Sequence, residues 1–350
     1  MNTTPPTTHR RSKHRALKSA LAGSAAILVT GGGLLVAAGA FAGSEPAAED
    51  AAAAPGFAPY VDTSLAPAYD VVGAAKEHGV KEFNLAFITG GDGCNPKWGG
   101  VTELGKDPVA AKIGELRDAG ADARVSFGGA AGSELGLVCD SADSLAAAYG
   151  KVIDEYKLKK ADFDIEGGAL PDAAANTRRA EAIAQLQKEH PDLDVTFTLP
   201  VMPEGLTQDG VNLLKTVEEK GVKVSAVNIM AMDYGPSYDG DMGKYATQAA
   251  TATQKQVKET FGLSDAEAWK SVVVTPMIGV NDVTVEKFTV ADAKELVAFA
   301  KEKKLGGLSM WSATRDKACE GGASDAVQPT CSSIEQSPND FTKAFAAYGG

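Results

Sequence analysis

The chain has 350 residues, of which 34 are Lys or Arg, 46 are Asp or Glu and four are His, so its formal net charge is −12. This acidity argues against a protein that binds nucleic acid or an anionic membrane, because phosphate groups are neutralised by clustered Lys and Arg. Two of the four His lie in a basic N-terminal segment, which leaves His78 and His190 for the folded part. A Ser–His–Asp triad or a His-rich metal site is therefore not expected, and nothing indicates a metal or a cofactor.

The first 42 residues have the layout of a secretory signal peptide. Five basic residues and no acid occur before an uncharged apolar stretch, which ends at Ala40-Phe41-Ala42-Gly43, a pattern typical of a cleavage site. We therefore expect removal of residues 1–42, secretion into the extracellular space and no stable membrane association afterwards. An uncleaved N-terminal anchor is the alternative, because the apolar stretch is long for a signal peptide. Residues 43–56 are rich in Ala, Pro and Glu, which predicts a flexible linker.

Residues 57–350 alternate between short β-branched runs and amphipathic helical patterns. The predicted strands are 59–63, 82–88, 123–128, 161–166, 194–199, 226–233, 271–279 and 307–312. The predicted helices are 68–79, 108–119, 141–157, 171–189, 207–220, 244–261, 289–304 and 337–347. Eight strand–helix units predict an α/β fold, a single-domain (β/α)8 TIM barrel without an insertion domain, which we expect to be a monomer. A doubly wound open sheet is the alternative, but it usually has a Gly-rich phosphate loop after its first strand, and none is seen here.

Four cysteines, Cys94, Cys139, Cys319 and Cys331, lie in the part that would be exported, so disulfides are expected. Four cysteines allow three pairings. Pairing of Cys319 with Cys331 closes a short local loop, and pairing of Cys94 with Cys139 joins two loops at the same end of consecutive strands. None has C-x-x-C spacing, which argues against a metal role.

The segment Asp162-Phe163-Asp164-Ile165-Glu166 is the most informative in the chain. Side chains alternate along a strand, so the three carboxyl groups share one face and the two apolar side chains share the other. In a barrel the outer face packs on helices, which points Asp162, Asp164 and Glu166 inward, with Glu166 nearest the C-terminal mouth. Carboxylates this close repel one another, so at least one pKa should rise and supply a protonated general acid.

This segment resembles the D-x-D-x-E signature of glycoside hydrolase family 18 chitinases. Three further motifs occur in the order of that family, on the third, sixth and eighth predicted strands: Ser126-Phe127-Gly128-Gly129 resembles S-x-G-G, Asn228–Tyr234 resembles the strand-six motif, and Trp311 resembles the Trp under the central sugar. Together the four motifs cover the predicted barrel, roughly residues 57 to 348.

The resemblance implies a secreted chitinase that cleaves β-1,4-linked N-acetylglucosamine polymers by a retaining, substrate-assisted mechanism. Glu166 would protonate the glycosidic oxygen, while the 2-acetamido oxygen of the substrate attacks the anomeric carbon. Asp164 would bind the acetamido N–H, and Asp162 would hold a proton beside it. The short connection after the seventh strand implies an open groove and endo-type cleavage.

Two positions depart from the family pattern. Lys159 stands where the fuller signature has an Asp, at the start of the strand and far from the mouth. The common strand-six pattern is M-x-Y-D, whereas here Met230-x-Met232-Asp233 is followed by Tyr234. Because positions 230, 232 and 234 share a face, Tyr234 is expected to reach the acetamido group, with Met232 as the other occupant of that place.

Further binding candidates follow other strand ends. The candidates for lining the cleft, beside Trp311, Met232 and Asp233, are Gly128, Gly129, Met202, Asn281 and, as an outer sugar platform, Trp98. Two competing functions remain open. One is an endo-β-N-acetylglucosaminidase that acts on N-glycans through the same D-x-D-x-E logic. The other is a non-catalytic chitinase-like lectin, which is disfavoured because such proteins usually lose the acid at the position of Glu166.

Overall fold

The computed structural model describes residues 56–349. The predicted leader and all of the predicted linker except Gly56 lie outside these residues. Between Gly56 and Gly349, no helix combines the length and the apolar character that crossing a bilayer requires.

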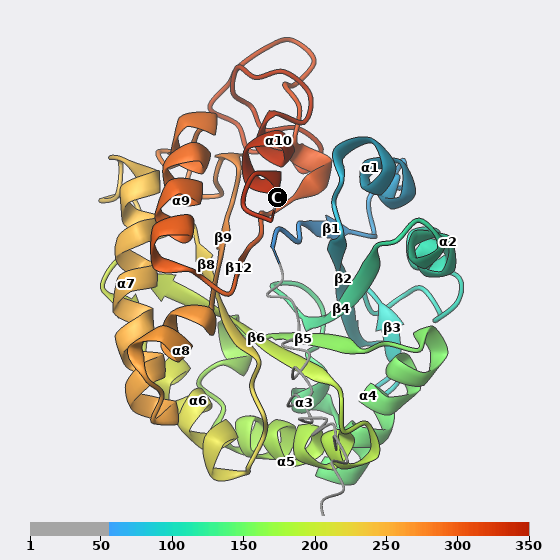
Figure 1. Ribbon diagram of the computed structural model, residues 1–350. Coiled ribbons are helices and arrows are strands. Elements are labelled where there is room, and N and C mark those ends of the chain that lie inside the picture. The colour runs from blue at the N-terminus through green and yellow to red at the C-terminus, as the bar shows by residue number, and fades with distance from the viewer. Residues whose placement is uncertain (1–55, 350) are drawn as a thin grey trace, which may run out of the picture. The chain divides into compact units, whose positions relative to one another are not determined.

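Eight parallel strands form a closed barrel (Figure 1). In order around the barrel they are β1 (Tyr60–Asp62), β2 (Glu82–Gly90), β4 (Asp122–Gly128), β5 (Lys160–Asp164), β6 (Asp194–Met202), β8 (Ala226–Ala231), β9 (Val272–Pro276) and β12 (Gly307–Leu308). Closure comes from the segment around β1: Ala58 N donates to Leu308 O at 2.9 Å, and Tyr60 N donates to Met310 O at 3.1 Å. The predicted (β/α)8 barrel is confirmed, and closure excludes the doubly wound open sheet.

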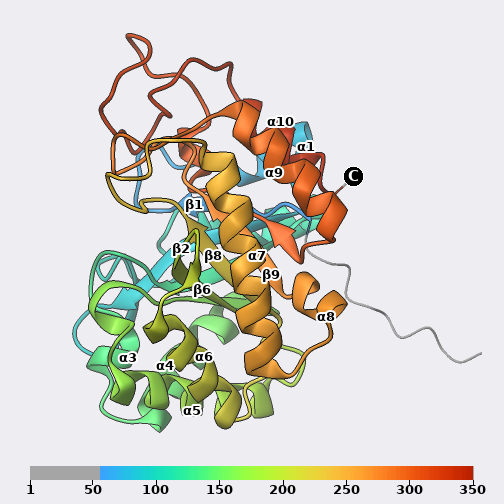
Figure 2. The same cartoon turned by 90° about the vertical axis from the view of Figure 1, so that its left-hand side faces the viewer.

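The helices cover the outside of the barrel (Figures 1 and 2). They are α1 (Val71–His78), α2 (Ile113–Asp118), α3 (Leu135–Val138), α4 (Ala142–Tyr156), α5 (Ala173–Glu189), α6 (Gln208–Glu219), α7 (Met242–Phe261), α8 (Asp265–Lys270), α9 (Val290–Lys303) and α10 (Asp340–Ala346). Local chemistry fixes several of their ends. Ser141 and Thr289 form capping boxes at the starts of α4 and α9. Gly79 and Gly262 take left-handed conformations at the ends of α1 and α7, where glycine avoids a steric penalty.

Short additional strands lie beside the eight barrel strands. They are β3 (Pro96–Trp98), β7 (Gly205–Leu206), β10 (Gly279–Val280) and β11 (Lys287–Phe288). The last two form a small antiparallel pair, and they are the only strands in the connection between β9 and α9 among the residues described. The sequence predicted no element at β3, β7, α3 or α8.

Both predicted disulfide pairings are present. Cys94 is bonded to Cys139 across 45 residues, and Cys319 is bonded to Cys331 across 12 residues. Cys94–Cys139 ties the loop after β2 to the end of α3, which follows β4, as the two-loop argument predicted. Cys319–Cys331 closes a loop in the segment between β12 and α10.

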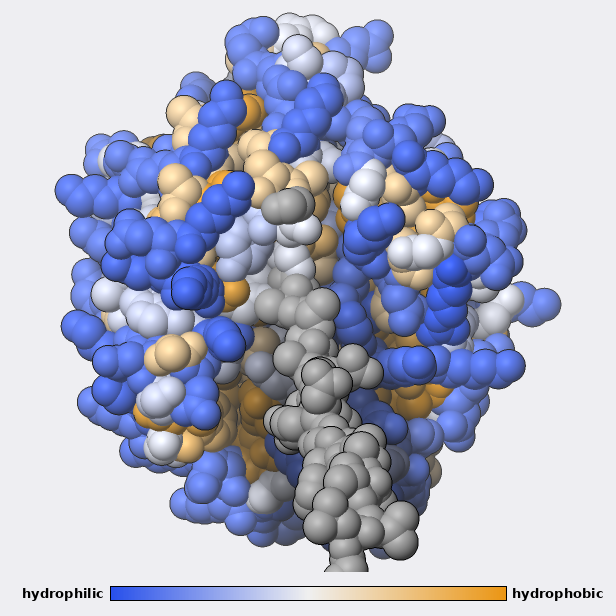
Figure 3. Space-filling view, in the orientation of Figure 1, coloured by the Kyte–Doolittle hydropathy of each residue, from blue (hydrophilic) through white to orange (hydrophobic). Residues whose placement is uncertain are grey.

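Outward-facing strand residues form the layer between barrel and helices. Phe163 of β5 stacks on Phe127 of β4 with ring centroids 5.3 Å apart, and Tyr149 of α4 packs against both rings edge-on. Because this apolar layer buries the outer face of β5, the alternating carboxylates must face the barrel interior. On the outside, Figure 3 shows mainly hydrophilic residues on this face, with apolar residues in small separate areas.

Candidate active site

The three carboxylates of the β5 segment lie inside the barrel, as the alternation predicted. Ser126 of β4 pairs in register with Asp162, and Thr198 of β6 pairs with Asp164. Glu166 continues past the end of β5 in extended conformation, with φ −141° and ψ −178°. The backbone therefore delivers one carboxyl group to the lower interior and two to the C-terminal end of the barrel.

Asp162 is the most enclosed of the three. Its Oδ2 accepts hydrogen bonds from Ser126 Oγ at 2.6 Å and from the Tyr60 hydroxyl at 2.9 Å, and its Oδ1 accepts one from Thr198 Oγ1 at 2.7 Å. Burial raises the pKa of Asp162, and these donors, with the charge of Arg124, oppose that rise. Arg124, a buried basic residue of β4, pairs with Glu82 and Asp194 rather than with the three carboxylates of the β5 segment.

Asp164 and Glu166 share a hydrogen bond, and the charge of Glu166 acts on Asp164. Asp164 is 3% exposed, and burial, followed by the negative charges of Glu166 and Asp162, raises its pKa well above the usual range. Burial also raises the pKa of Glu166, while a hydrogen bond with Asp164 opposes that rise. The pair therefore keeps a proton at pH values where exposed carboxyl groups are ionised. Asp164 Oδ1 is buried and accepts no hydrogen bond from an N–H or hydroxyl group among the residues described, so it can accept one from a ligand.

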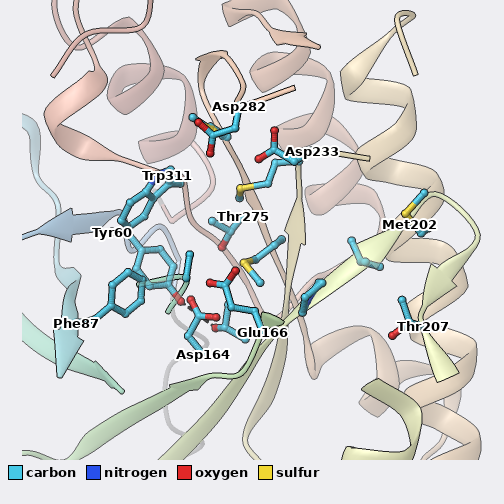
Figure 4. A pocket seen from close by; sticks show the side chains of 17 residues that line it. Tyr60, Phe87, Asp164, Glu166, Met202, Thr207, Asp233, Thr275, Asp282 and Trp311 are labelled. Atoms are coloured by element: carbon cyan, nitrogen blue, oxygen red, sulfur yellow. Dashed lines mark hydrogen bonds between the residues drawn. The ribbon is translucent and has the colours of Figure 1, made fainter. Parts of the chain in front are cut away.

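A cavity of about 340 Å³ opens above this pair (Figure 4). Its walls consist of aromatic, methionine, threonine and acidic side chains. The residues that line it are Tyr60, Phe87, Ala130, Asp164, Glu166, Thr198, Pro200, Val201, Met202, Thr207, Met230, Met232, Asp233, Thr275, Met277, Asp282 and Trp311. No group of three or more His, Cys, Asp or Glu residues between 56 and 349 is arranged to hold a metal ion.

One wall of the cavity is aromatic. Trp311 stacks on Phe87 with ring centroids 5.6 Å apart, and Tyr60 is tilted against Trp311 at 6.0 Å. Figure 4 shows these three rings together at one side, with Met202 and Thr207 at the other and Asp164 and Glu166 at the base. An apolar ring face beside carboxylates suits a sugar, whose pyranose ring has an apolar C–H face and a polar rim.

Gly128 and Gly129 shape the site without lining the cavity. Their φ angles are 106° and 86°, a conformation that residues with a Cβ rarely adopt. A Cβ on Gly128 would overlap the carbonyl oxygen of Asp164, and one on Gly129 would lie 2.8 Å from the Phe87 ring. The two glycines therefore allow β4 to approach the catalytic strand closely, and neither is among the residues that line the cavity.

Trp98 and Asn281, predicted to face the cleft, are buried elsewhere. Trp98 is 2% exposed in β3, where its indole N–H donates to the Tyr156 hydroxyl at 2.8 Å, so it is not an outer sugar platform. Asn281 is completely buried, and its side-chain amide donates to the carbonyls of Met277 and Gly279. Its neighbour Asp282 lines the cavity instead.

Tyr234 also lies away from the cavity. Its ring packs with Tyr238 and Tyr245 at centroid distances of 5.6 and 6.1 Å, and its hydroxyl is buried. Strand β8 ends at Ala231, and Asp233 has a φ of 52°, so the alternation that placed Tyr234 on the inward face stops before it. Met232 and Asp233 line the cavity, and of the two strand-six alternatives Met232 occupies the inward place.

Several cavity residues were not predicted from the sequence. Tyr60, Phe87 and Asp282 belong to none of the recognised motifs: Tyr60 begins β1, Phe87 lies within β2, and Asp282 follows β10. Tyr60 and Thr198 carried a usable signal, since both are polar residues at inward positions of predicted strands beside the carboxylates. Phe87 and Asp282 carried none, because their approach to Trp311 and Asp233 depends on how the barrel closes.

The comparisons with known proteins agree with this geometry. No protein-family model matches the chain. The chain is 36% identical over 308 residues to a protein of Escherichia coli (strain K12) described as "Probable bifunctional chitinase/lysozyme", covering 83% of this chain and 34% of that protein. It is 37% identical over 273 residues to "Endochitinase 11" of Metarhizium anisopliae, covering 74% of this chain and 52% of that protein. The chain thus spans about a third and about half of these two relatives.

A solved structure matches over nearly its whole length. The catalytic domain of the hyperthermophilic chitinase from Pyrococcus furiosus is 36% identical, superposes with a TM-score of 0.76, and is matched over 94% of its chain and 83% of this one. A closed barrel with an inward carboxylate strand and an aromatic wall defines a site of the glycosidase type. The chain belongs to the glycoside hydrolase family 18 chitinases.

Proposed function

We propose that the protein is a secreted chitinase that hydrolyses β-1,4-linked N-acetylglucosamine polymers with retention of configuration, assisted by the substrate's own acetamido group. The observation that carries the proposal is the pairing of a buried Asp164, which has one free carboxyl oxygen, with a Glu166 whose pKa is raised by burial. The matched Pyrococcus furiosus chitinase has been solved with chito-oligosaccharides. This supports a chito-oligosaccharide as the ligand of the corresponding cavity.

The geometry assigns a distinct task to each carboxyl group. Glu166 lies at the cavity base and donates its proton to the glycosidic oxygen, for which a raised pKa is suitable. Asp164 lies behind Glu166 and accepts a hydrogen bond from the acetamido N–H, so that the acetamido oxygen attacks the anomeric carbon and forms an oxazolinium ring. The bond between the anomeric carbon and the glycosidic oxygen breaks in this step, and the protonated oxygen leaves as a hydroxyl group of the departing sugar. The Glu166 carboxylate then takes a proton from a water molecule, which attacks the anomeric carbon and opens the oxazolinium ring. Asp162, held by three hydroxyl donors, places negative charge beside Asp164 and so helps to keep a proton on the pair formed by Asp164 and Glu166.

Two features support endo-type cleavage and extracellular action. The connection between β9 and α9 has only the short strands β10 and β11 among the residues described, so no long insertion walls the cavity on that side. The two disulfides are typical of an oxidising compartment, in agreement with the predicted leader. An endo-acting enzyme releases a mixture of oligomers from a long chain, whereas release of dimers alone would contradict this part of the proposal.

The test uses two substrates, one active-site variant and one control variant. The protein is expected to hydrolyse chitin oligomers and to leave a high-mannose glycoprotein intact. Glycan release without oligomer hydrolysis would instead establish an endo-β-N-acetylglucosaminidase, and binding of oligomers without cleavage a lectin. Glu166→Gln is expected to lower kcat by roughly 10²- to 10⁴-fold, the usual contribution of a general acid. Glu77→Gln, on the exposed face of α1, is the control for the loss of one carboxylate.

A further inference from the structure

An ion pair is buried beside the catalytic strand, and the reaction proposed above does not use it. The side chain of Arg179 on α5 is 1% exposed, and that of Glu134, which precedes α3, is 6% exposed. The Arg179 guanidinium donates to both carboxylate oxygens of Glu134, over 2.7 Å from Nη2 and 3.3 Å from Nε. Removal of two charges from water is unfavourable, so a buried ion pair adds little net stability through its own attraction. The groups that this pair contacts therefore indicate its role.

The ion pair orients a side-chain amide that holds the chain after the catalytic acid. Arg179 Nη1 donates to Asn176 Oδ1 at 2.5 Å, and Asn176 Nδ2 donates to the carbonyl oxygen of Leu170 at 2.8 Å. Asn176 is 5% exposed and Leu170 is 7% exposed, so water does not compete for this bond. Because Arg179 can only donate, it fixes the amide of Asn176 with its oxygen toward α5 and its N–H toward Leu170.

The segment between Glu166 and Leu170 has little rigidity of its own. The three residues after Glu166 are glycine, glycine and alanine, and the first of them, Gly167, has a φ of 52°. Glycine adopts many backbone conformations, so this segment does not restrict the chain by itself. Ala169 N donates to the Glu166 carbonyl at 3.1 Å in a single 3₁₀ turn beyond the end of β5. The Asn176 amide anchors the residue directly after this turn.

The other end of the ion pair reaches the neighbouring strand. Glu134 Cγ lies 3.7 Å from the position of a Cβ on Gly128, where the Asp164 carbonyl packs against β4. Gly129 N donates to the same carbonyl at 3.1 Å. The network thus joins the loop after β4 to the turn after β5. The main charges that shift the pKa of Asp164 and of Glu166 come from carboxylates, so the ion pair acts on them through geometry rather than through its charge.

We propose that Asn176, oriented by the ion pair of Glu134 and Arg179, is a positioning residue that holds Glu166 at the glycosidic oxygen. A general acid must lie within hydrogen-bond reach of the oxygen that it protonates, and a displacement of about 1 Å can lower the rate by roughly a hundredfold. Without the anchor, the segment of two glycines allows Glu166 to move away from this oxygen. The aromatic wall of the cavity comes from other strands and stays in place, so proton transfer is impaired more than sugar binding.

This inference rests on the proposed function, and one series of substrates tests both. The substrates are aryl β-glycosides of the N-acetylglucosamine dimer, which are nearly equal in size and whose phenols differ in acidity. A strongly acidic phenol leaves as its anion with little help, whereas a weakly acidic phenol needs the proton of Glu166. Because kcat/KM reports the steps up to departure of the phenol, its decrease with decreasing phenol acidity measures how well the acid is placed.

Asn176→Leu removes the amide and keeps a side chain of similar size. We expect kcat/KM to fall by roughly tenfold to a hundredfold for the least acidic phenol and by less than about twofold for the most acidic one. Glu166→Gln should show the same dependence on phenol acidity, more strongly. Asn84→Leu is the matched control, because Asn84 is 6% exposed and its amide donates to the Ala58 carbonyl at 2.9 Å, outside the cavity lining. It should lower stability and keep the wild-type dependence.

Arg179→Lys is the second variant, and it decides the question if Asn176→Leu does not fold. It keeps the positive charge beside Glu134 but replaces the planar fork by a single nitrogen, so the Asn176 amide is less well oriented. We expect the same change in the dependence on phenol acidity, to a smaller extent. A decrease in kcat/KM that is equal for all phenols, or no decrease, would show a structural role only and overturn the inference. If the wild-type protein cleaves neither these glycosides nor chitin oligomers, the proposed function is wrong instead.

Discussion

The hydroxyl of Tyr60 donates a hydrogen bond to Asp162 over 2.9 Å, although the two residues are 102 positions apart. Tyr60 lies on the first strand of the barrel and Asp162 on the fourth, so this bond crosses the barrel interior beneath the catalytic pair. Asn228 extends the network by donating to the Tyr60 hydroxyl at 3.1 Å and to Thr198 at 3.0 Å. The base of the active site is thus fixed by polar side chains from four strands.

Asp164→Asn is expected to stabilise the protein and inactivate it. The folded-state pKa of Asp164 is raised, so the native state binds more protons than the unfolded one, and stability falls as pH rises through that folded pKa. The Asn side chain does not ionise, so the variant does not lose this stability as the pH rises. The variant should gain roughly 1 kcal/mol at neutral pH, as is common when a strained functional site is relaxed. The gain should disappear below about pH 4, where the unfolded Asp is also protonated.

The measurement is thermal unfolding of both proteins across pH, together with hydrolysis of chitin oligomers. Activity should fall at least roughly hundredfold, because the variant lacks the carboxylate that faces the acetamido group while positive charge develops on it. The exposed Asp140→Asn serves as the control and should alter neither property. A lower melting temperature at neutral pH for Asp164→Asn would show that its carboxylate stabilises the fold.

Substitution of two tryptophans should distinguish a residue that binds the sugar from one that packs in the interior. Trp311 lines the cavity, so Trp311→Ala should lower kcat/KM by roughly thirtyfold, equivalent to about 2 kcal/mol, with little change in unfolding temperature. Trp98 is buried and hydrogen-bonded to Tyr156, so Trp98→Phe should lower stability by about 1–3 kcal/mol and leave KM unchanged. Steady-state kinetics and chemical unfolding of both variants check this. An increase of KM in Trp98→Phe would restore its role as a sugar platform.

The strand of carboxylates was predictable because two local rules agree there. A period of two placed Asp162, Asp164 and Glu166 on one face, and the apolar Phe163 and Ile165 identified the other face as the buried outside. The eight strand–helix units were predictable for the same reason, since each has its own period and its own end signals. Boundaries shifted by a few residues, as for the helix predicted at 108–119, where α2 covers only Ile113–Asp118 after a turn of 3₁₀ helix.

The cavity wall was less predictable because it depends on contacts that are distant in sequence. Trp98 lies in a polar segment that suggested exposure, but β3 pairs with β2 and brings its indole to Tyr156, 58 residues further on. Tyr234 was misplaced because one residue, Asp233, has a positive φ and ends the alternation. Asp282 is positioned at the cavity by the hydrogen bond from Val283 N to Asp233, which joins two strand ends 50 residues apart. Local patterns contain none of these contacts.

Because β4 lies very close to the catalytic strand, we expect substitution of Gly128, at the end of β4, to be unusually destabilising. In Gly128→Ala the new methyl group would overlap the Asp164 carbonyl at a φ of 106°, so the backbone under the catalytic pair must move. We expect a loss of more than about 3 kcal/mol in stability, with a large loss of activity. Gly79→Ala is the matched control, because its φ of 71° is also left-handed but no atom lies within 4 Å of the added Cβ. It should cost about 1 kcal/mol and leave activity unchanged. Equal costs for the two variants would mean that φ alone, and not the contact with Asp164, requires glycine at position 128.

The two disulfides should contribute unequally to stability. Cys94–Cys139 spans 45 residues and Cys319–Cys331 spans 12, so the first restricts the unfolded chain more. Loop-closure entropy gives losses of about 4 kcal/mol for Cys94→Ala with Cys139→Ala and about 3 kcal/mol for Cys319→Ala with Cys331→Ala. Denaturant unfolding of the two double variants, with the intact protein as reference, measures the difference. If removal of the shorter bridge were the more damaging, the loop that it closes would be stabilising the native state through its own packing between β12 and α10. The slope of the free energy of unfolding against denaturant should stay the same in all three proteins if the denatured states remain equally expanded.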